Sequence, residues 1–434
     1  MSALTLDRMR DAARPVTYGR ISRIVGMEIE IHGLSAPIGA AIEIPTNNGI
    51  IEAEVVALRA DSLICLPFGE LRGVEVGTLC GRGSTEPSLA VGPGLLGRVI
   101  DGLGRPIDGL GPIVAAEHVS IEGKVPHPLH RPMIRQQLDL GVRAVDTLIP
   151  VGRGQRVGIF AGSGVGKSSL LSMFARGTNA SVTVLALIGE RGREVREFIE
   201  NDLGPEGLAR SVVVVSTSDE PALVRLRAAF TATRITEYFR DEGHDALLLM
   251  DSLTRFAMAQ REVGLAAGEP PATRGYPPSV FGMLPKLLER AGTDTLGSIT
   301  GLYTVLIEGD DLMDPIGDAA RAILDGHLVL SRQLATAGHF PSIDVLESIS
   351  RVAPAITDRT QRDAASTFRR LMAAYRDARD LIEIGAYVAG TNPDVDRSIA
   401  LKETMDGFLR QDLHDLTPAS DAWTQLTALV EWPA

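Results

Sequence analysis

The sequence predicts an α/β fold that follows a small β-rich domain and precedes a helical one. Residues 16 to about 92 contain short apolar runs interrupted by glycine, a pattern typical of strands. Continuous apolar runs then alternate with helical stretches to about residue 356, and the remaining chain carries an apolar stripe at helical spacing. We therefore expect an N-terminal β-domain over residues 1–92, an α/β domain over 93–356 and a helical domain over 357–434.

The first domain carries a strong hairpin signal. Asn47-Asn48-Gly49 separates the run Ile42–Pro45 from the run Ile50–Leu58. Asparagine and glycine both tolerate positive φ, which tight hairpin turns require. Several such strands within so short a span predict a small closed barrel, and Gly92-Pro93-Gly94 marks its boundary.

The middle domain contains apolar runs of the kind that fill a parallel sheet covered on both faces. The last domain is predicted to be helical, because Phe368, Leu371, Tyr375, Ala378 and Ile382 recur at three- and four-residue steps. The expected strands of the middle domain are Arg156–Phe160, Val182–Ile188, Val212–Ser216, Ala246–Met250 and Tyr303–Ile307.

Composition excludes several classes of protein. The chain of 434 residues carries a net charge of -12 and only 4% aromatic residues, which argues against a nucleic-acid binder. Cys65 and Cys80 suggest no disulfide framework and fit a reducing cytoplasm. Met1 to Arg20 shows no apolar core of a signal peptide, and no apolar run approaches the about 20 residues of a membrane helix.

The most informative segment is a glycine-rich turn between a predicted strand and a predicted helix. Such a turn directs backbone N–H groups toward phosphate oxygens, and the helix adds its positive N-terminal end. The lysine can reach the β- and γ-phosphates, and the serine hydroxyl can ligate Mg²⁺. The strict pattern begins with glycine, whereas this phosphate-binding loop begins with alanine: Ala161, Gly162, Ser163, Gly164, Val165, Gly166, Lys167 and Ser168.

Two carboxylates follow predicted strands downstream of this loop. Asp251 ends an apolar strand. Its carboxylate can hold the ligand shell of Mg²⁺, or Asp251 is an ordinary turn residue. Glu190 follows a strand and a glycine, so it can orient and polarise an attacking water. Alternatively, Glu190 is an acid favoured by the start of a helix.

Two further side chains have a functional and an ordinary interpretation. Arg351 is either a surface arginine or a guanidinium that stabilises charge on a γ-phosphate. Phe340 is either a core residue or a surface on which a base stacks. His127 and His130 are separated by a proline and lack nearby partner ligands, so a zinc site is not expected.

Taken together, these segments resemble the ATPases of type III protein export, which are relatives of the α and β subunits of rotary ATP synthases. The similarity runs from about residue 16 to 420. Members of this family also begin the loop with alanine. The resemblance is carried by Gly154–Gly158, Ala161–Ser168, Gly189–Val195, Asp251–Phe256, Gly275–Ser279 and Ser350–Val352.

The resemblance implies a RecA-like P-loop ATPase core between an N-terminal β-barrel and a C-terminal helical domain. It also implies ATP and Mg²⁺ as ligands and a ring-shaped homo-hexamer. By position, Lys167 and Ser168 bind phosphate and Mg²⁺, Asp251 supports the metal ion, and Glu190 positions water.

The resemblance assigns roles to the other two side chains as well. Phe340 matches an adenine-stacking aromatic, and Arg351 matches an arginine finger that reaches a neighbouring subunit's site. The implied partners are a stator-like regulator, a stalk-like subunit, the export gate, and export substrates with their chaperones. The implied location of the protein is the cytoplasmic side of the inner membrane, with at most a peripheral association with the membrane.

Several functions remain open at this point. Gly385–Asp396 resembles the flagellar version of the family more than the virulence-injectisome version. A catalytic subunit of a rotary ATP synthase shares the site chemistry, but Phe256–Pro278 resembles export ATPases. A non-catalytic nucleotide-binding subunit would lack the carboxylate that Glu190 supplies, and an RNA translocase is disfavoured by the acidic balance and few aromatics.

Overall fold

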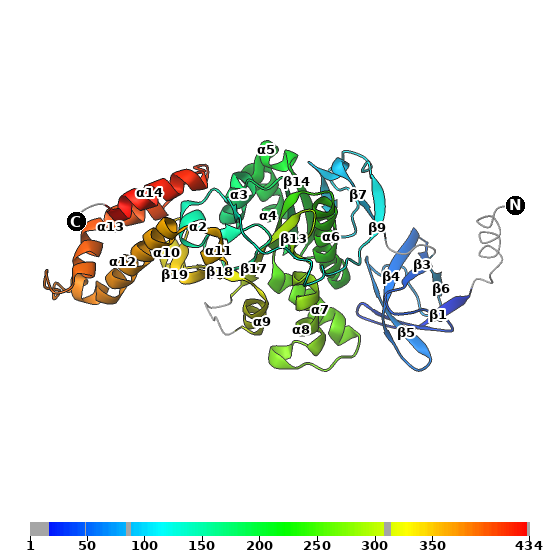
Figure 1. Ribbon diagram of the computed structural model, residues 1–434. Coiled ribbons are helices and arrows are strands. Elements are labelled where there is room, and N and C mark those ends of the chain that lie inside the picture. The colour runs from blue at the N-terminus through cyan, green and yellow to red at the C-terminus, as the bar shows by residue number, and fades with distance from the viewer. Residues whose placement is uncertain (1–16, 48, 84–87, 308–313, 432–434) are drawn as a thin grey trace.

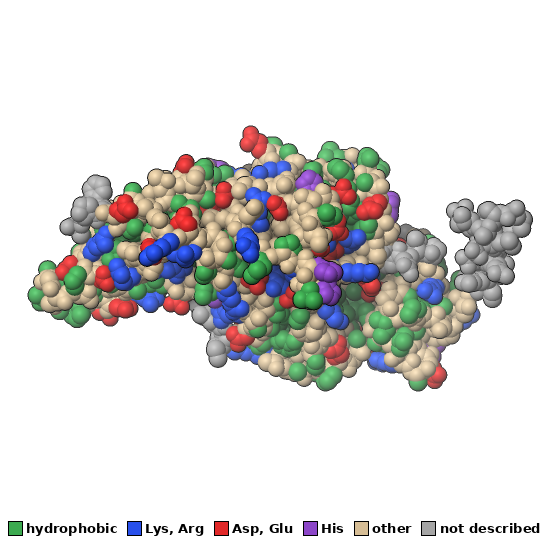
Figure 2. Space-filling model, viewed as in Figure 1, with side chains coloured by type: hydrophobic (Ala, Val, Ile, Leu, Met, Phe, Trp, Pro, Cys, Tyr) green, Lys and Arg blue, Asp and Glu red, His purple; other side chains and the backbone are tan. Residues whose placement is uncertain are grey.

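A computed structural model describes residues 17–47, 49–83, 88–307 and 314–431. In these residues the chain forms a β-barrel at one end, a sheet covered by helices in the middle, and a group of helices at the other end (Figure 1). Figure 2 shows acidic and basic side chains intermingled over the visible face. Within the described ranges, no helix is both long and apolar enough to cross a membrane.

The N-terminal strands close into the predicted barrel, in the order β1-β2-β5-β4-β3-β6. Alternate side chains such as Ile29 and Ile31 point inward and are fully buried. The predicted hairpin is present, because Thr46 pairs with Gly49 across the turn, although Asn48 lies outside the described residues. The strands are β1 (Tyr18–Val25), β2 (Glu28–His32), β3 (Ala41–Thr46), β4 (Gly49–Leu58), β5 (Ser62–Pro67) and β6 (Leu79–Arg82).

The central sheet has nine strands, eight of them in the order β19-β18-β12-β17-β15-β13-β14-β8. All neighbours on this path are parallel except β18 and β19, and the short strand β16 adds an antiparallel pair to β17. The five strands expected from continuous apolar runs are all present. The sheet consists of β8 (Val99–Asp101), β12 (Arg156–Ala161), β13 (Val182–Glu190), β14 (Ser211–Thr217), β15 (Asp245–Asp251), β16 (Gly292–Thr293), β17 (Ser298–Leu306), β18 (Gly326–Leu330) and β19 (Ile343–Ser350).

Each face of the sheet has its own hydrophobic core. In β13, Leu185 and Leu187 belong to the core on one face, while Val184 and Ala186 belong to the core on the other. This alternation explains why the strand is apolar throughout. The helices of this domain are α2 (Arg143–Leu148), α3 (Lys167–Gly177), α4 (Gly192–Glu197), α5 (Gly204–Ala209), α6 (Ala222–Asp241), α7 (Leu253–Ala266), α8 (Pro278–Leu288), α9 (Pro315–Ile323) and α10 (Arg332–Thr336).

Several small elements lie outside the barrel and the central sheet. The strands β7 (Ser88–Val91) and β9 (Glu117–Ser120) pair with each other outside the barrel, and so do β10 (Gln137–Leu138) and β11 (Val151–Gly152). Short 3₁₀ turns occur at η1 (Pro93–Leu95) and η3 (Thr273–Gly275), and the π-helix η2 (Phe198–Leu203) joins α4 to α5.

The C-terminal domain is helical as predicted. It comprises α11 (Ala353–Ile356), α12 (Arg359–Glu383), α13 (Pro393–Leu409) and α14 (Ala419–Glu431). Asp358 and Gln361 form a reciprocal capping box that starts α12. Phe368 and Leu371 of the predicted stripe are fully buried, and they join the same core as one face of the central sheet.

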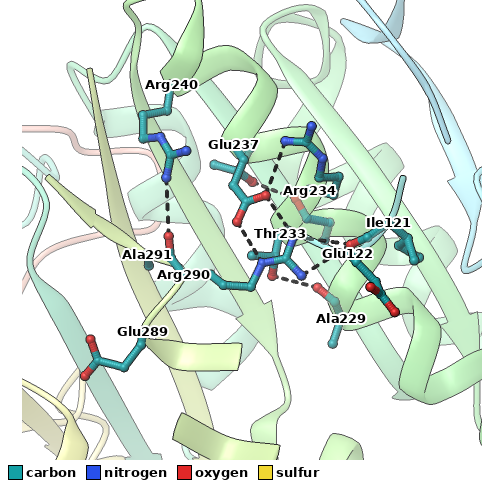
Figure 3. A network of polar contacts seen from close by, with 12 residues as sticks. Ile121, Glu122, Ala229, Thr233, Arg234, Glu237, Arg240, Glu289, Arg290 and Ala291 are labelled. Carbon is teal, nitrogen blue, oxygen red and sulfur yellow. Dashed lines mark hydrogen bonds and ion pairs between the residues drawn. The ribbon is translucent and has the colours of Figure 1, made fainter. Parts of the chain in front are cut away.

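A buried ion-pair cluster anchors the segment that follows β9 (Figure 3). Arg290 donates from Nε and Nη2 to the two carboxylate oxygens of Glu237, at 2.7 and 2.8 Å. Arg290 also donates to the carbonyl of Ile121, and Arg234 donates to Glu237. The cluster therefore joins α6, the residues after α8 and the connecting segment in one polar network.

Candidate active site

The predicted phosphate-binding loop lies between β12 and α3. The strand ends at Ala161, and the helix begins at Lys167. Gly164 and Gly166 have φ values of 74° and 86°, in the left-handed region that glycine adopts without steric cost. Ala161 still belongs to the strand and is fully buried, so its methyl group packs inside the sheet without obstructing the turn.

The loop is held in place by the segment that joins β18 to β19. The hydroxyl of Ser342 donates to the carbonyl of Val165 at 2.6 Å, and Ser342 is 1% exposed. Arg332 donates to the carbonyl of Ser163 at 3.3 Å. These contacts preorganise the loop from a part of the chain more than a hundred residues away.

Three side chains from separate elements meet at the start of α3. The Lys167 ammonium lies 2.5 Å from Oδ1 of Asp251 and 3.3 Å from Oε1 of Glu190. Asp251 and Glu190 end the neighbouring parallel strands β15 and β13, so their carboxylates share one edge of the sheet. The structure thus brings together the lysine and both carboxylates that the sequence analysis singled out.

A β-bulge turns Glu190 toward this cluster. The pairing of β13 with β14 shifts between Ile188 and Glu190, and the residue between them, Gly189, has a φ of 70°. A Cβ atom at Gly189 would lie 3.1–3.2 Å from the side chain of Arg255. Glycine is therefore needed here, and Arg255 packs beside the site although the sequence analysis did not single it out.

The charges of the cluster shift one another's protonation. Burial raises the pKa of Glu190, and the charge of Lys167 offsets only part of this increase. Burial alone would lower the pKa of Lys167, but the charges of Asp251 and Glu190 raise it above the ordinary lysine value. The ammonium therefore remains charged, while Glu190 becomes a stronger base than an exposed glutamate.

Asp251 has a second partner that the sequence did not reveal. The hydroxyl of Thr304, near the C-terminal end of β17, donates to Oδ1 of Asp251 at 2.7 Å. Thr304 is fully buried, and nothing in its local sequence distinguishes it from other strand threonines.

The residues present fit a magnesium ion bound together with phosphates. Ser168 is exposed in the first turn of α3, and Asp251 already holds one cationic group, the Lys167 ammonium. Among the residues that the structure describes, no group of three or more His, Cys, Asp or Glu side chains could hold a metal ion by itself. Magnesium usually takes one or two protein ligands and completes its shell with water and substrate phosphates, so Ser168 and Asp251 suffice.

Phe340 lies against the phosphate-binding loop. A Cβ atom at Gly166 would lie 3.3 Å from the Phe340 ring, and 45% of Phe340 is exposed. The backbone carbonyl of Phe340 accepts a hydrogen bond from the N–H of Gln411, in the C-terminal domain. One surface of the ring therefore remains available to a base beside the phosphates.

Arg351 is not part of this cluster within one chain. It follows β19 directly and is exposed. Its backbone N–H donates to the carbonyl of Asp325 at 3.0 Å, and its guanidinium donates to the carbonyl of Arg321 at 3.4 Å. In the described residues, no hydrogen bond or ion pair joins it to Lys167.

Comparison with known proteins assigns the two C-terminal parts of the chain to known families. Residues 141–350 match the model described as the ATP synthase alpha/beta family, nucleotide-binding domain. Residues 357–428 match the model described as the T3SS EscN ATPase C-terminal domain.

Individual proteins are similar over nearly the whole chain. The flagellum-specific ATP synthase of Bacillus subtilis is 49% identical, over 95% of both chains. The type 3 secretion system ATPase of Xanthomonas euvesicatoria is 48% identical, over 95% of this chain and 94% of the other. The assembled ATPase EscN of enteropathogenic E. coli, solved with its central stalk EscO, has a TM-score of 0.88 and 46% identity, over 95% of this chain and 100% of that chain.

Proposed function

Because this chain belongs to the ATP synthase α/β family and, within it, to the flagellum-specific and type 3 secretion ATPases, we propose that it is a Mg²⁺-dependent ATP hydrolase that energises type III export of flagellar proteins. The observation that carries the proposal is the meeting of Lys167, Glu190 and Asp251 at the start of α3. A phosphate-binding loop alone binds nucleotide, whereas these two carboxylates add what hydrolysis requires.

Each residue of the cluster has a role in this proposal. Lys167 binds the β- and γ-phosphates, and Glu190 orients the attacking water and accepts its proton. Asp251 and the Ser168 hydroxyl hold the metal ion. Mg²⁺, when bound, neutralises charge on the phosphate oxygens. The raised pKa of Glu190, which burial causes, supports its role as the base.

Two residues at the margin of the site complete the proposal. Phe340 stacks on the adenine, with its half-exposed ring against Gly166. Arg351 acts as an arginine finger in the site of a neighbouring subunit, which is supported by its exposure and by its hydrogen bond to the carbonyl of Arg321 rather than to the Lys167 cluster.

We further propose a homo-hexamer that works with a stalk-like subunit, a stator-like regulator, the export gate, and substrates with their chaperones. The similarity to an ATPase solved in assembled form with its central stalk supports the ring and the stalk. The proposed location is the cytoplasm, peripheral to the membrane export apparatus. Nucleic acid is not a proposed partner, because the net charge is -12.

A virulence-type secretion ATPase is the second candidate, because the Xanthomonas relative is almost as similar as the Bacillus one. The turn between α12 and α13, within Gly385–Asp396, favours the flagellar assignment by its sequence. In the structure, Tyr387 of this turn donates to Asp396 at 2.9 Å, so the turn is internally bonded.

The test is flagellin secretion in cells whose only copy carries Lys167→Ala, with expression verified and cellular ATP synthesis measured in parallel. We expect filament proteins to remain inside the cell while ATP synthesis is normal. Normal flagellin secretion with loss of another secreted protein would support the injectisome candidate instead. Reduced ATP synthesis would support a rotary ATP synthase.

A further inference from the structure

We propose that Thr304 is a positioning residue for the magnesium-bound nucleotide, and that it acts by holding the Asp251 carboxylate. Its hydroxyl donates to Oδ1 of Asp251 at 2.7 Å. The alternative acceptor, the carbonyl of Met250, lies 3.4 Å away, so the single hydroxyl proton is directed to the carboxylate. This inference rests on the function proposed above.

The position of Thr304 in the sheet explains why it can do this. Strand β17 lies between β12, which leads into the phosphate-binding loop, and β15, which ends in Asp251. Thr304 pairs with Ile159 on one side, and Tyr303 pairs with Met250 on the other. The hydroxyl therefore lies on the strand that pairs both with β12, which leads into the phosphate-binding loop, and with β15, which ends in Asp251.

Asp251 needs this contact most when nucleotide is bound. In the structure, Oδ1 accepts hydrogen bonds from both Lys167 and Thr304. The proposed role of Lys167 is to bind phosphates, which draws its ammonium away from Asp251. Thr304 is then the donor that still fixes Oδ1, and a hydrogen bond from a hydroxyl to a carboxylate is short and strong.

Loss of the hydrogen bond from Thr304 to Asp251 should affect mainly the part of nucleotide affinity that depends on Mg²⁺. Partners that orient a metal-binding carboxylate typically affect metal affinity or activity by about 10–100-fold when removed. A merely structural hydroxyl would weaken folding, and with it nucleotide binding, whether or not the metal ion is present. The two roles therefore differ in one measurable quantity, the ratio of nucleotide affinity with Mg²⁺ to that without.

The experiment measures ADP binding by calorimetry in the presence of Mg²⁺ and in EDTA, for the wild-type protein, Thr304→Val and Thr304→Ser. Valine has the shape of threonine without the hydroxyl. We expect Thr304→Val to reduce the Mg²⁺-dependent gain in affinity by about 10-fold or more, and Thr304→Ser to restore most of it. If Thr304→Val does not fold, Thr304→Ala answers the same question.

Thr300→Val is the matched control. Thr300 lies on the same strand, is 1% exposed, and accepts a hydrogen bond from the N–H of Gly154. The Thr300→Val protein should keep the wild-type ratio of ADP affinity with Mg²⁺ to ADP affinity without Mg²⁺, even if this variant is less stable. An unchanged ratio in Thr304→Val, or an equal loss of affinity with and without Mg²⁺, overturns the inference. A wild-type protein that binds no ADP would instead overturn the proposed function.

Discussion

The Lys167 ammonium lies 2.5 Å from Oδ1 of Asp251, and this contact joins the start of α3 to the end of β15. The side chains are 12% and 5% exposed, so little water screens their attraction. Asp251 therefore offsets the charge of the lysine that is proposed to bind phosphate. In the proposed function, phosphates that bind this ammonium have to compete with Asp251.

Glu190→Gln should keep nucleotide binding and lose turnover. The amide keeps the size of the side chain but cannot accept a proton, and loss of a general base costs about 10²–10⁴-fold in rate. The measurement is steady-state ATP hydrolysis together with ADP affinity. Glu197→Gln is the control, because Glu197 is half-exposed on α4 and pairs with Arg193. Hydrolysis within a few-fold of wild type would remove Glu190 from its assigned role.

Arg351→Ala and Lys167→Ala should each abolish turnover and should complement each other when mixed. In a mixed ring, some sites combine an intact Lys167 with an intact Arg351 from the neighbouring subunit. The measurement is ATP hydrolysis after the two variants are unfolded, mixed and reassembled. Arg359→Ala, at an arginine that is 91% exposed, should retain activity. Failure of every mixing ratio to recover hydrolysis would argue that Arg351 acts within its own chain.

Phe340→Ala should weaken ATP binding, whereas Phe340→Tyr should not. Stacking of a base on an aromatic side chain is worth about 1–3 kcal/mol, and tyrosine retains the ring. The affinities for ATP and for inorganic triphosphate should be measured side by side. Only the affinity for ATP should fall in Phe340→Ala. A parallel loss for triphosphate would mean that the ring, which lies against Gly166, supports the loop rather than the base.

Glu237→Gln should destabilise the protein strongly. Glu237 and Arg290 are 1% and 5% exposed, and removing one member of a buried ion pair costs about 3–5 kcal/mol. The free energy of unfolding should be measured by urea denaturation followed by circular dichroism. Glu242→Gln is the control, because Glu242 follows the same helix and is exposed. A loss of stability no larger than in the control would show that the network in Figure 3 contributes little.

Five of the nine strands of the central sheet, and the carboxylates at the ends of two of them, could be predicted from the sequence, whereas β8, β16, β18 and β19 were not. Continuous apolar runs mark buried strands, and Glu190 and Asp251 follow such runs directly. That these two residues meet was not predicted, because the sequence does not show that β13 and β15 are neighbours in the sheet. The phosphate-binding loop was visible because its geometry needs glycine at fixed positions.

Contacts that depend on register between distant strands could not be predicted. Thr304 reaches Asp251 only because β17 pairs with β15 in one particular alignment, and no local pattern encodes that alignment. Arg255, on α7, and Ser342, before β19, were also missed, because each reaches the site only through the packing of separate elements. The stretch Gly264–Pro278 is rich in glycine and proline, which is typical of a loop, yet α7 continues to Ala266 and a short turn forms at Thr273–Gly275.

Strand β19 has a consequence for timing within the proposed ring. It begins shortly after Phe340 and ends immediately before Arg351, so its eight residues span about 26 Å at about 3.3 Å per residue. In the proposed function, Phe340 contacts the nucleotide of its own subunit and Arg351 contacts that of the next. Any shift of β19 on binding or release of adenine therefore moves the finger at the other end. Adjacent subunits of the proposed ring would then hydrolyse ATP in succession rather than at random.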